Sequence, residues 1–165
     1  MPYSRRIDER DPIGAALRGE NPMVMARMRT GFAVIGDTQH LPGYSLLLAD
    51  DTTVDHLTDL PRARRRDFLF DLSLLGEAVF AVTRPRGARR LNYEVLGNGW
   101  SHLHGHVHVR YEWEPPERIT GPVWRYPKEV RNAPGHAYDE ARHGELRTAI
   151  TAELNRAMTE AYANV

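Results

Sequence analysis

Hydrophobic positions recur at the helical period in three parts of the chain. The first part is short: Asp11-Pro12 precedes an apolar stripe made by Ile13, Ala16 and Leu17, and Gly19 follows it. Aspartate is a favoured N-cap, proline suits the first helical position, and glycine commonly follows the last turn. We therefore expect a short helix that begins at Asp11-Pro12 and stops before Gly19.

Two longer helices follow from the same reasoning. Apolar residues three or four apart predict a main helix that opens at Asp59-Leu60-Pro61, with Asp59 as its cap, and runs to about Val82; they are Leu72, Leu75, Val79 and Val82. Apolar residues at every fourth position predict a final amphipathic helix from Tyr138 to Tyr162; they are Leu146, Ile150, Leu154 and Met158.

Short apolar runs bounded by turn residues predict five strands. The expected strands cover residues 23–28, 32–35, 44–48, 91–96 and 102–113. The run 45–49 is continuously apolar, which is typical of a strand buried on both faces. Residues 115–137 are rich in proline and glycine and are expected to form an extended arm, with Trp124 and Tyr126 as anchors.

The order of these elements is helix, three strands, helix, two strands, arm, helix. This order predicts an α+β fold with one antiparallel sheet of about five strands, a long central helix and a C-terminal helix. We expect one domain over residues 1–165, with a core at about 22–114 and with residues 115–165 as the arm and the final helix.

Four histidines lie at alternate positions in the last expected strand: His102, His104, His106 and His108. Strand alternation puts residues i, i+2 and i+4 on one face, so the four imidazoles should point the same way. Burying such a row in a core would cost desolvation of titratable rings. The pattern therefore favours a cleft, a metal site or an anion site. The other four histidines of the chain are scattered and are expected at the surface.

Composition narrows the class of protein. The 165 residues carry 22 basic and 22 acidic side chains, which argues against binding a nucleic acid polymer over a broad basic surface. The absence of cysteine excludes disulfides, thiolate metal sites and cysteine nucleophiles, and fits a cytoplasmic protein. No apolar run approaches the ~18 residues of a membrane span, and the N-terminus has no secretory signal.

The histidine strand also resembles a known signature. His-x-His-x-His followed, after a gap, by Arg110 is similar to the motif of the histidine triad superfamily of nucleotide hydrolases and transferases, with Val109 in place of the family's proline. Aligned on Arg110, the triad is His102, His104 and His106, and His108 is an additional histidine. Asp37 and the turn Pro42-Gly43 extend the resemblance, which covers about residues 22–114; Tyr44 stands where the family has a further histidine.

The resemblance implies roles for these residues. His104 would attack an α-phosphorus, His106 would hold a phosphoryl oxygen and help to protonate the leaving group, and His102 would support the site. Substrate contacts would come from Asp37 at the ribose, from Asn92, and from Arg110. Asn98 lies where the family has a glutamine. His108 would either contact a distal phosphate or face solvent as an ordinary strand residue.

The implied activity is that of a phosphohydrolase or nucleotidyl transferase. The pattern looks most similar to the bacterial diadenosine tetraphosphate hydrolase-like branch, which would act on a dinucleoside polyphosphate or another nucleoside phosphate without a cofactor. Family members commonly form homodimers through the long helix and its neighbouring strand, although a monomer would bury the same apolar residues against its own sheet.

Two other functions remain open. His-x-His on a strand can present imidazoles to zinc, so a metal-dependent hydrolase is one alternative. A nucleotide-binding module with weak catalysis is the other, because Val109, Tyr44 and the missing glutamine depart from the family pattern.

Overall fold

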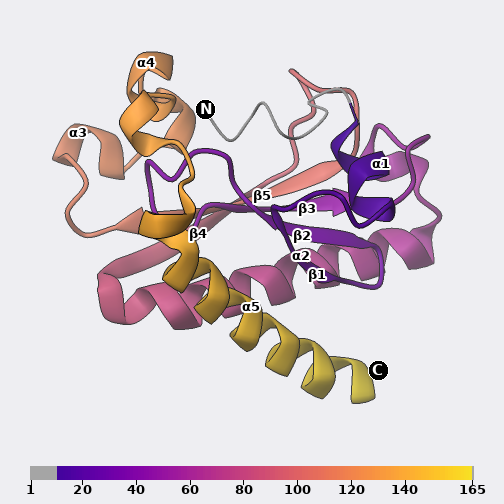
Figure 1. Cartoon of the computed structure of the whole chain (residues 1–165). Helices are drawn as coiled ribbons and strands as arrows, with labels where there is room; N and C mark the ends of the chain where they lie inside the picture. The colour runs from indigo at the N-terminus through magenta and orange to yellow at the C-terminus, as the bar shows by residue number, and fades with distance from the viewer. Residues whose placement is uncertain (1–10, 165) are drawn as a thin grey trace.

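The computed structural model describes residues 11–164, and its elements follow the expected α+β order (Figure 1). The five strands are β1 (Val24–Arg27), β2 (Gly31–Ile35), β3 (Ser45–Ala49), β4 (Ala88–Glu94) and β5 (His104–Tyr111). The main helices are α1 (Pro12–Leu17), α2 (Arg62–Thr83) and α5 (Glu140–Ala163). The prediction of one antiparallel sheet, a long central helix and a C-terminal helix is confirmed.

The strands form a single sheet in the order β1-β2-β3-β5-β4, with antiparallel pairing at every step. β3 and β5 are therefore interior strands, and Ser45 pairs with Val107 where they meet. All but one residue of β3 is buried, as its continuous apolar run predicts. This pairing brings the segment that leads into β3 alongside the histidines of β5.

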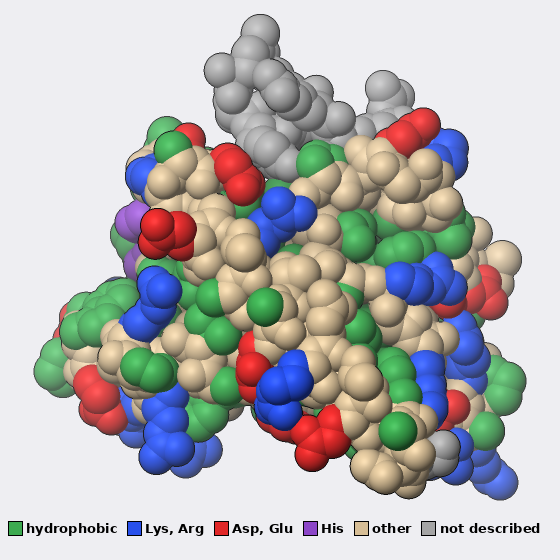
Figure 2. Space-filling model, turned by 60° about the horizontal axis from the view of Figure 1, so that its bottom comes forward, with side chains coloured by type: hydrophobic (Ala, Val, Ile, Leu, Met, Phe, Trp, Pro, Cys, Tyr) green, Lys and Arg blue, Asp and Glu red, His purple; other side chains and the backbone are tan. Residues whose placement is uncertain are grey.

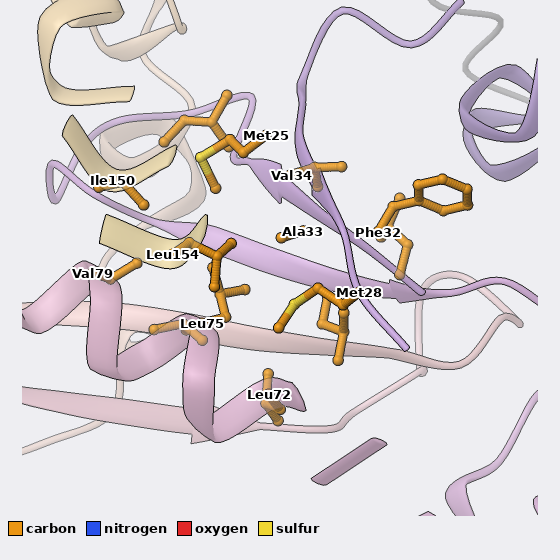
Figure 3. Packing of buried hydrophobic residues seen from close by; sticks show 14 of the residues in the cluster. Met25, Met28, Phe32, Ala33, Val34, Leu72, Leu75, Val79, Ile150 and Leu154 are labelled. Carbon is orange, nitrogen blue, oxygen red and sulfur yellow. The ribbon is translucent and has the colours of Figure 1, made fainter. Parts of the chain in front are cut away.

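Helices α2 and α5 cover one face of the sheet (Figure 1). Their apolar residues meet those of β1 and β2 in the core, where Leu72, Leu75, Val79, Ile150 and Leu154 are all buried (Figure 3). Of the β5 residues that alternate with the histidines, Val107 and Val109 have no exposed surface and belong to the same core.

Gly105 lets α2 approach the strand closely. A Cβ added there would lie 2.8 Å from both Cδ atoms of Leu72, which is closer than van der Waals contact allows. A side chain at this position would therefore push α2 away from the strand. β5 thus presents helix-packing residues on one face and imidazoles on the other.

Three sequence predictions need correction. Asp59 does not cap α2: its carboxylate accepts from the backbone N–H groups of Asp55 and His56 at the end of a short 3-10 helix (Leu57–Asp59), and Pro61 precedes the first turn. β4 covers residues 88–94 rather than 91–96, because Gly87 ends the preceding turn at positive φ and the strand begins at once. His102 precedes β5 instead of lying within it.

The proline-rich arm is not simply extended. It contains α3 (Pro116–Ile119), α4 (Lys128–Arg131) and two 3-10 turns (Val123–Arg125 and Pro134–His136). Each of these four begins at or directly after a proline, whose restricted φ suits a first helical position. Prolines that suggested an extended segment therefore start single turns of helix.

A buried ion pair holds the arm on the sheet. The Arg110 guanidinium lies 2.7 Å from the Glu114 carboxylate, and both side chains are almost fully buried. Its remaining donors reach the amide oxygen of Asn92 and the carbonyls of Arg118 and Gly121. Glu114 also accepts from the hydroxyl of Tyr126. All five N–H groups of Arg110 are thus engaged within the protein.

Charges are mixed on the surface formed by α2 and α5. Figure 2 shows basic and acidic side chains interspersed there, without a broad patch of either sign. Among the helices of residues 11–164, none combines the length and apolar character that crossing a membrane requires.

We predict that Glu114→Gln lowers the free energy of unfolding by about 3–5 kcal/mol, because it leaves the Arg110 charge buried without its counter-ion. Glu112→Gln is the matched control, since the Glu112 side chain is 73% exposed and lies 3.8 Å from its ion-pair partner Arg89. It should change stability by less than about 0.5 kcal/mol. Urea unfolding measures both variants, and a Glu114→Gln protein as stable as the parent would contradict the assignment.

Candidate functional site

The rings of His104, His106 and His108 form a row, and His102 joins one end of it through Trp100. Ring centroids of His104 and His106 are 4.8 Å apart, and those of His106 and His108 are 5.5 Å apart. All four side chains are largely buried. Trp100 packs against His102 and His104 at one end of the row, while Trp124 meets the other two rings edge to face.

The hydrogen bond of His104 decides which of its nitrogens is free. Its Nδ1 lies 2.6 Å from the carbonyl oxygen of His102. A carbonyl only accepts, so Nδ1 carries the proton of the neutral ring and Nε2 keeps its lone pair. No described residue makes a hydrogen bond to that Nε2. In its neutral form the second histidine of the row therefore presents an unengaged lone pair at Nε2.

His102 is held by the neighbouring strand. Its Nε2 donates to the carbonyl oxygen of Ala49 over 3.1 Å, at the end of β3. Burial lowers the pKa of His102 below its ordinary value, so the ring is neutral near pH 7. The same residue thus supports His104 through its backbone and is itself fixed through its side chain.

His106 is neutral as well, and it contacts Tyr44. Its Nδ1 lies 2.8 Å from the Tyr44 hydroxyl. Burial, with a smaller contribution from His104, lowers the pKa of His106 to about 4. No described residue makes a hydrogen bond to its Nε2. His106 thus adds no positive charge to the row at neutral pH, although it retains an N–H donor.

His108 is the most deeply enclosed ring of the row. Tyr44 stacks on it with centroids 4.3 Å apart, and burial lowers the pKa of His108 to about 3. Its Nε2 has no hydrogen-bond partner and lies 3.9 Å from the Glu94 carboxylate, which instead accepts from the Trp124 indole over 2.5 Å. At neutral pH His108 is uncharged, so its approach to Glu94 is a neutral contact and not an ion pair.

Two hollows lie at the two ends of the row. One, of about 180 Å³, is lined by His108, Tyr44, Trp124, Asp37 and Arg131 among others. The other, of about 280 Å³, is lined by His102 and His104 together with Asp55, His56, Val95 and Leu96. A molecule with two bulky parts joined by phosphate could occupy both ends while its phosphorus lies at the histidines.

The residues expected to contact substrate do not all line the two hollows. Asp37 is exposed and lines the hollow beside His108. Asn92 pairs with His108 across β4 and β5, but its amide oxygen accepts from Arg110. Since every N–H of Arg110 is engaged, Arg110 offers no free donor to a phosphate, whereas Asn92 Nδ2 donates one N–H to the Leu91 carbonyl and keeps a second. Asn98 is exposed and lines neither hollow.

Several site residues were not singled out from the sequence. His40 was expected at the surface, but both its ring nitrogens are buried without a partner beside the smaller hollow. Glu94 and Arg131 also join the site. The alternation of β4 could have indicated Glu94, which pairs with His106. Arg131 lies in the folded arm, and no local sequence pattern predicts that it lines the hollow.

Among residues 11–164, no three histidine or carboxylate side chains are placed so that they could share one metal ion. Glu94 accepts from the Trp124 indole, and Nδ1 of His104 and Nδ1 of His106 each have a partner of their own.

The fold is that of histidine triad proteins. Histidine triad structures from Marinobacter aquaeolei and Sinorhizobium meliloti superimpose with TM-scores of 0.66 and 0.67 at 22% and 20% identity. These matches cover 81% and 89% of this chain, and 89% and 95% of theirs. A zinc-bound histidine triad family protein from Mycobacterium smegmatis gives 0.56 at 20% identity, covering 87% of this chain and 94% of that one.

Comparison of the sequence alone gives no match. No family model matches it, and no curated protein has a similar sequence. At such identities the structural likeness establishes the fold alone.

The neutral histidines predict a loss of stability in acid. In the unfolded chain His108 has an ordinary pKa of about 6.5, so below that pH the unfolded state binds a proton that the folded state does not. The free energy of unfolding should therefore fall as the pH drops from about 6.5 towards the folded pKa. We predict that His108→Leu makes the loss between pH 7 and pH 5 smaller by about 2 kcal/mol.

His56→Leu is the control, because the His56 side chain is 74% exposed. Urea unfolding at a series of pH values measures all three proteins. Parallel pH profiles for the parent and for His108→Leu would show that His108 takes up its proton equally in both states, against the prediction.

Proposed function

We propose that this chain is a histidine triad phosphohydrolase or nucleotidyl transferase in which His104 is the nucleophile. The observation that carries the proposal is the hydrogen bond from His104 Nδ1 to the His102 carbonyl, which leaves the Nε2 lone pair unengaged within the row. The shared fold supports it, because the matched histidine triad proteins have the same architecture over most of their length.

The reaction would proceed in two displacements. The Nε2 lone pair of His104 forms a bond to the α-phosphorus while the bond from that phosphorus to the leaving oxygen breaks, and the electron pair departs with the leaving group. His104 keeps the proton on its Nδ1, which remains hydrogen-bonded to the His102 carbonyl, and the ring becomes a nucleotidyl-imidazolium. Water then bonds to phosphorus, the N–P bond breaks, and the proton of the water passes to solvent. Another acceptor in place of water would give transfer.

The substrate class we favour is a dinucleoside polyphosphate or another nucleoside phosphate with a leaving group. Asp37 supports this assignment, because an exposed carboxylate can accept hydrogen bonds from two vicinal hydroxyls of a ribose. The hollow that contains Asp37 would hold the nucleoside, and the hollow beside His102 would hold the departing part. Within this proposal His108 borders the nucleoside side of the row.

We predict that His104→Ala lowers turnover of diadenosine tetraphosphate by at least roughly a thousandfold, because it removes the atom that bonds to phosphorus. Calorimetry should show that the variant still binds the substrate within a few-fold of the parent. Rapid quenching of the parent enzyme followed by peptide mass analysis should find an adenylate on His104. His143→Ala is the control, since His143 lies on α5, outside the row.

Each alternative function predicts a different result in the same experiment. A metal-dependent hydrolase would lose activity with a chelator and regain it with zinc, without an adenylated histidine. A binding module would retain the nucleotide unchanged in the parent protein. Full activity of His104→Ala would contradict the nucleophile assignment.

We also propose a homodimer that forms across β4 and α2. β4 is the last strand of the sheet, and no described strand pairs with its outer edge. Large apolar side chains are exposed along this strand and the residues that follow it, at Tyr93, Val95 and Leu96, and α2 adds Leu69 and Phe70. Exposed apolar residues gathered near an open sheet edge are typical of an interface.

A double substitution tests the dimer. Val95→Lys with Leu96→Glu should convert the protein to a monomer in sedimentation equilibrium, because both side chains would carry charge into the interface. Trp113→Lys is the control, since Trp113 is 57% exposed and lies beyond β5. A parent protein that is monomeric at high micromolar concentration would contradict the proposal.

A further inference from the structure

Tyr44 occupies a position from which it can reach two histidines of the row. It directly precedes β3, and the antiparallel register that pairs Ser45 with Val107 puts Tyr44 opposite His108. Its ring stacks on His108 with an interplanar angle of 4°. A tyrosine is long enough to reach the diagonal neighbour on the adjacent strand, and the hydroxyl lies 2.8 Å from Nδ1 of His106.

The direction of that hydrogen bond follows from the surroundings of the hydroxyl. Burial raises the pKa of Tyr44 far above its ordinary value, with further contributions from Asp37 and Glu94, so the phenol remains protonated. Among the described residues, His106 Nδ1 is the hydroxyl's one hydrogen-bond partner. A buried O–H without an acceptor would cost free energy, so the hydroxyl donates and Nδ1 of His106 accepts.

His104 and His106 therefore differ in the position of their protons. The His102 carbonyl requires an Nδ1 proton on His104, while the Tyr44 hydroxyl requires an Nδ1 lone pair on His106. One ring consequently presents a lone pair at Nε2, and the next presents an N–H at Nε2. These are the two complementary groups that attack on a phosphorus and stabilisation of its oxygens require.

We propose that Tyr44 is a positioning residue that fixes the His106 tautomer with the proton on Nε2, so that His106 donates a hydrogen bond to an oxygen of the phosphoryl group attacked by His104. The role at phosphorus rests on the function proposed above, whereas the tautomer itself does not. Because burial holds the pKa of His106 at about 4, the ring is a neutral hydrogen-bond donor at pH 7 and retains its proton.

The variant that tests this proposal is Tyr44→Phe, which removes the hydroxyl and keeps a ring to stack on His108. Nitrogen-15 spectra of the histidine-labelled parent at pH 7.5 should show His106 protonated at Nε2. In Tyr44→Phe this ring should exchange between its tautomers. With the p-nitrophenyl ester of AMP as the probe, kcat should fall roughly tenfold to a hundredfold, while KM changes by less than about threefold.

Tyr162→Phe is the matched control. Its hydroxyl also donates to a buried acceptor, the carboxylate of Asp71, but it lies on α5 against α2 and makes no contact with the row. It should reduce stability and leave the His106 spectrum and kcat unchanged. An effect of Tyr44→Phe that arose from general loosening would appear in this control too.

The spectrum of the parent alone can overturn the proposal, even if Tyr44→Phe folds poorly. A His106 ring protonated at Nδ1 would do so, and so would a Tyr44→Phe protein with the parent tautomer and the parent kcat. If the parent shows the Nε2 tautomer but turns over neither the ester nor diadenosine tetraphosphate, the assigned tautomer stands and the proposed function fails.

Discussion

The chemistry of the site depends on which nitrogen carries the proton in each of several neutral imidazoles that are buried side by side. Desolvation keeps His106 and His108 uncharged at neutral pH, so each ring carries one proton and one lone pair. The hydrogen-bond partner of Nδ1 then decides whether Nε2 carries the lone pair or the proton. The His102 carbonyl leaves the Nε2 lone pair of His104 open for the proposed attack, and the Tyr44 hydroxyl leaves the proton of His106 on Nε2 for the proposed hydrogen bond to substrate.

The fold supplies these partners through strand register. β5 carries imidazoles on one face, while on the other Gly105, Val107 and Val109 allow α2 to pack closely. β3 lies next to β5 and brings Tyr44 to one end of the row and Ala49 to the other. The rigid core behind the strand thus holds the rings in place without contributing any atom to the proposed chemistry.

The arm completes the site in a way that depends on a buried charge. Arg110 continues the alternation of the histidines, yet it binds Glu114 and backbone carbonyls of the arm. This anchor lets Trp124 reach the edges of His106 and His108, and it places Arg131 beside the hollow that contains Asp37. Arg110, which the signature suggests for substrate contact, instead holds the arm against the site.

Much of the fold could be predicted because hydrophobic periodicity and alternation are local signals. The helices α2 and α5, all five strands and the shared face of the histidines followed from them. The site was less predictable where a partner is distant in sequence. Arg110 and Asn92 were expected as substrate contacts, but in the structure the Arg110 guanidinium donates to Asn92 across β5 and β4 and to backbone carbonyls of the arm. Tyr44 was noticed as a departure from the family pattern, but its length became informative only with the register of β3 on β5.

The stereochemical course at phosphorus tests the central claim most directly. A nucleoside phosphorothioate ester that is chiral at the α-phosphorus can be hydrolysed in ¹⁸O-labelled water and the configuration of the product determined. Two successive in-line displacements, first by His104 and then by water, predict overall retention. Inversion would mean that water attacks phosphorus directly, and it would contradict a nucleophilic histidine.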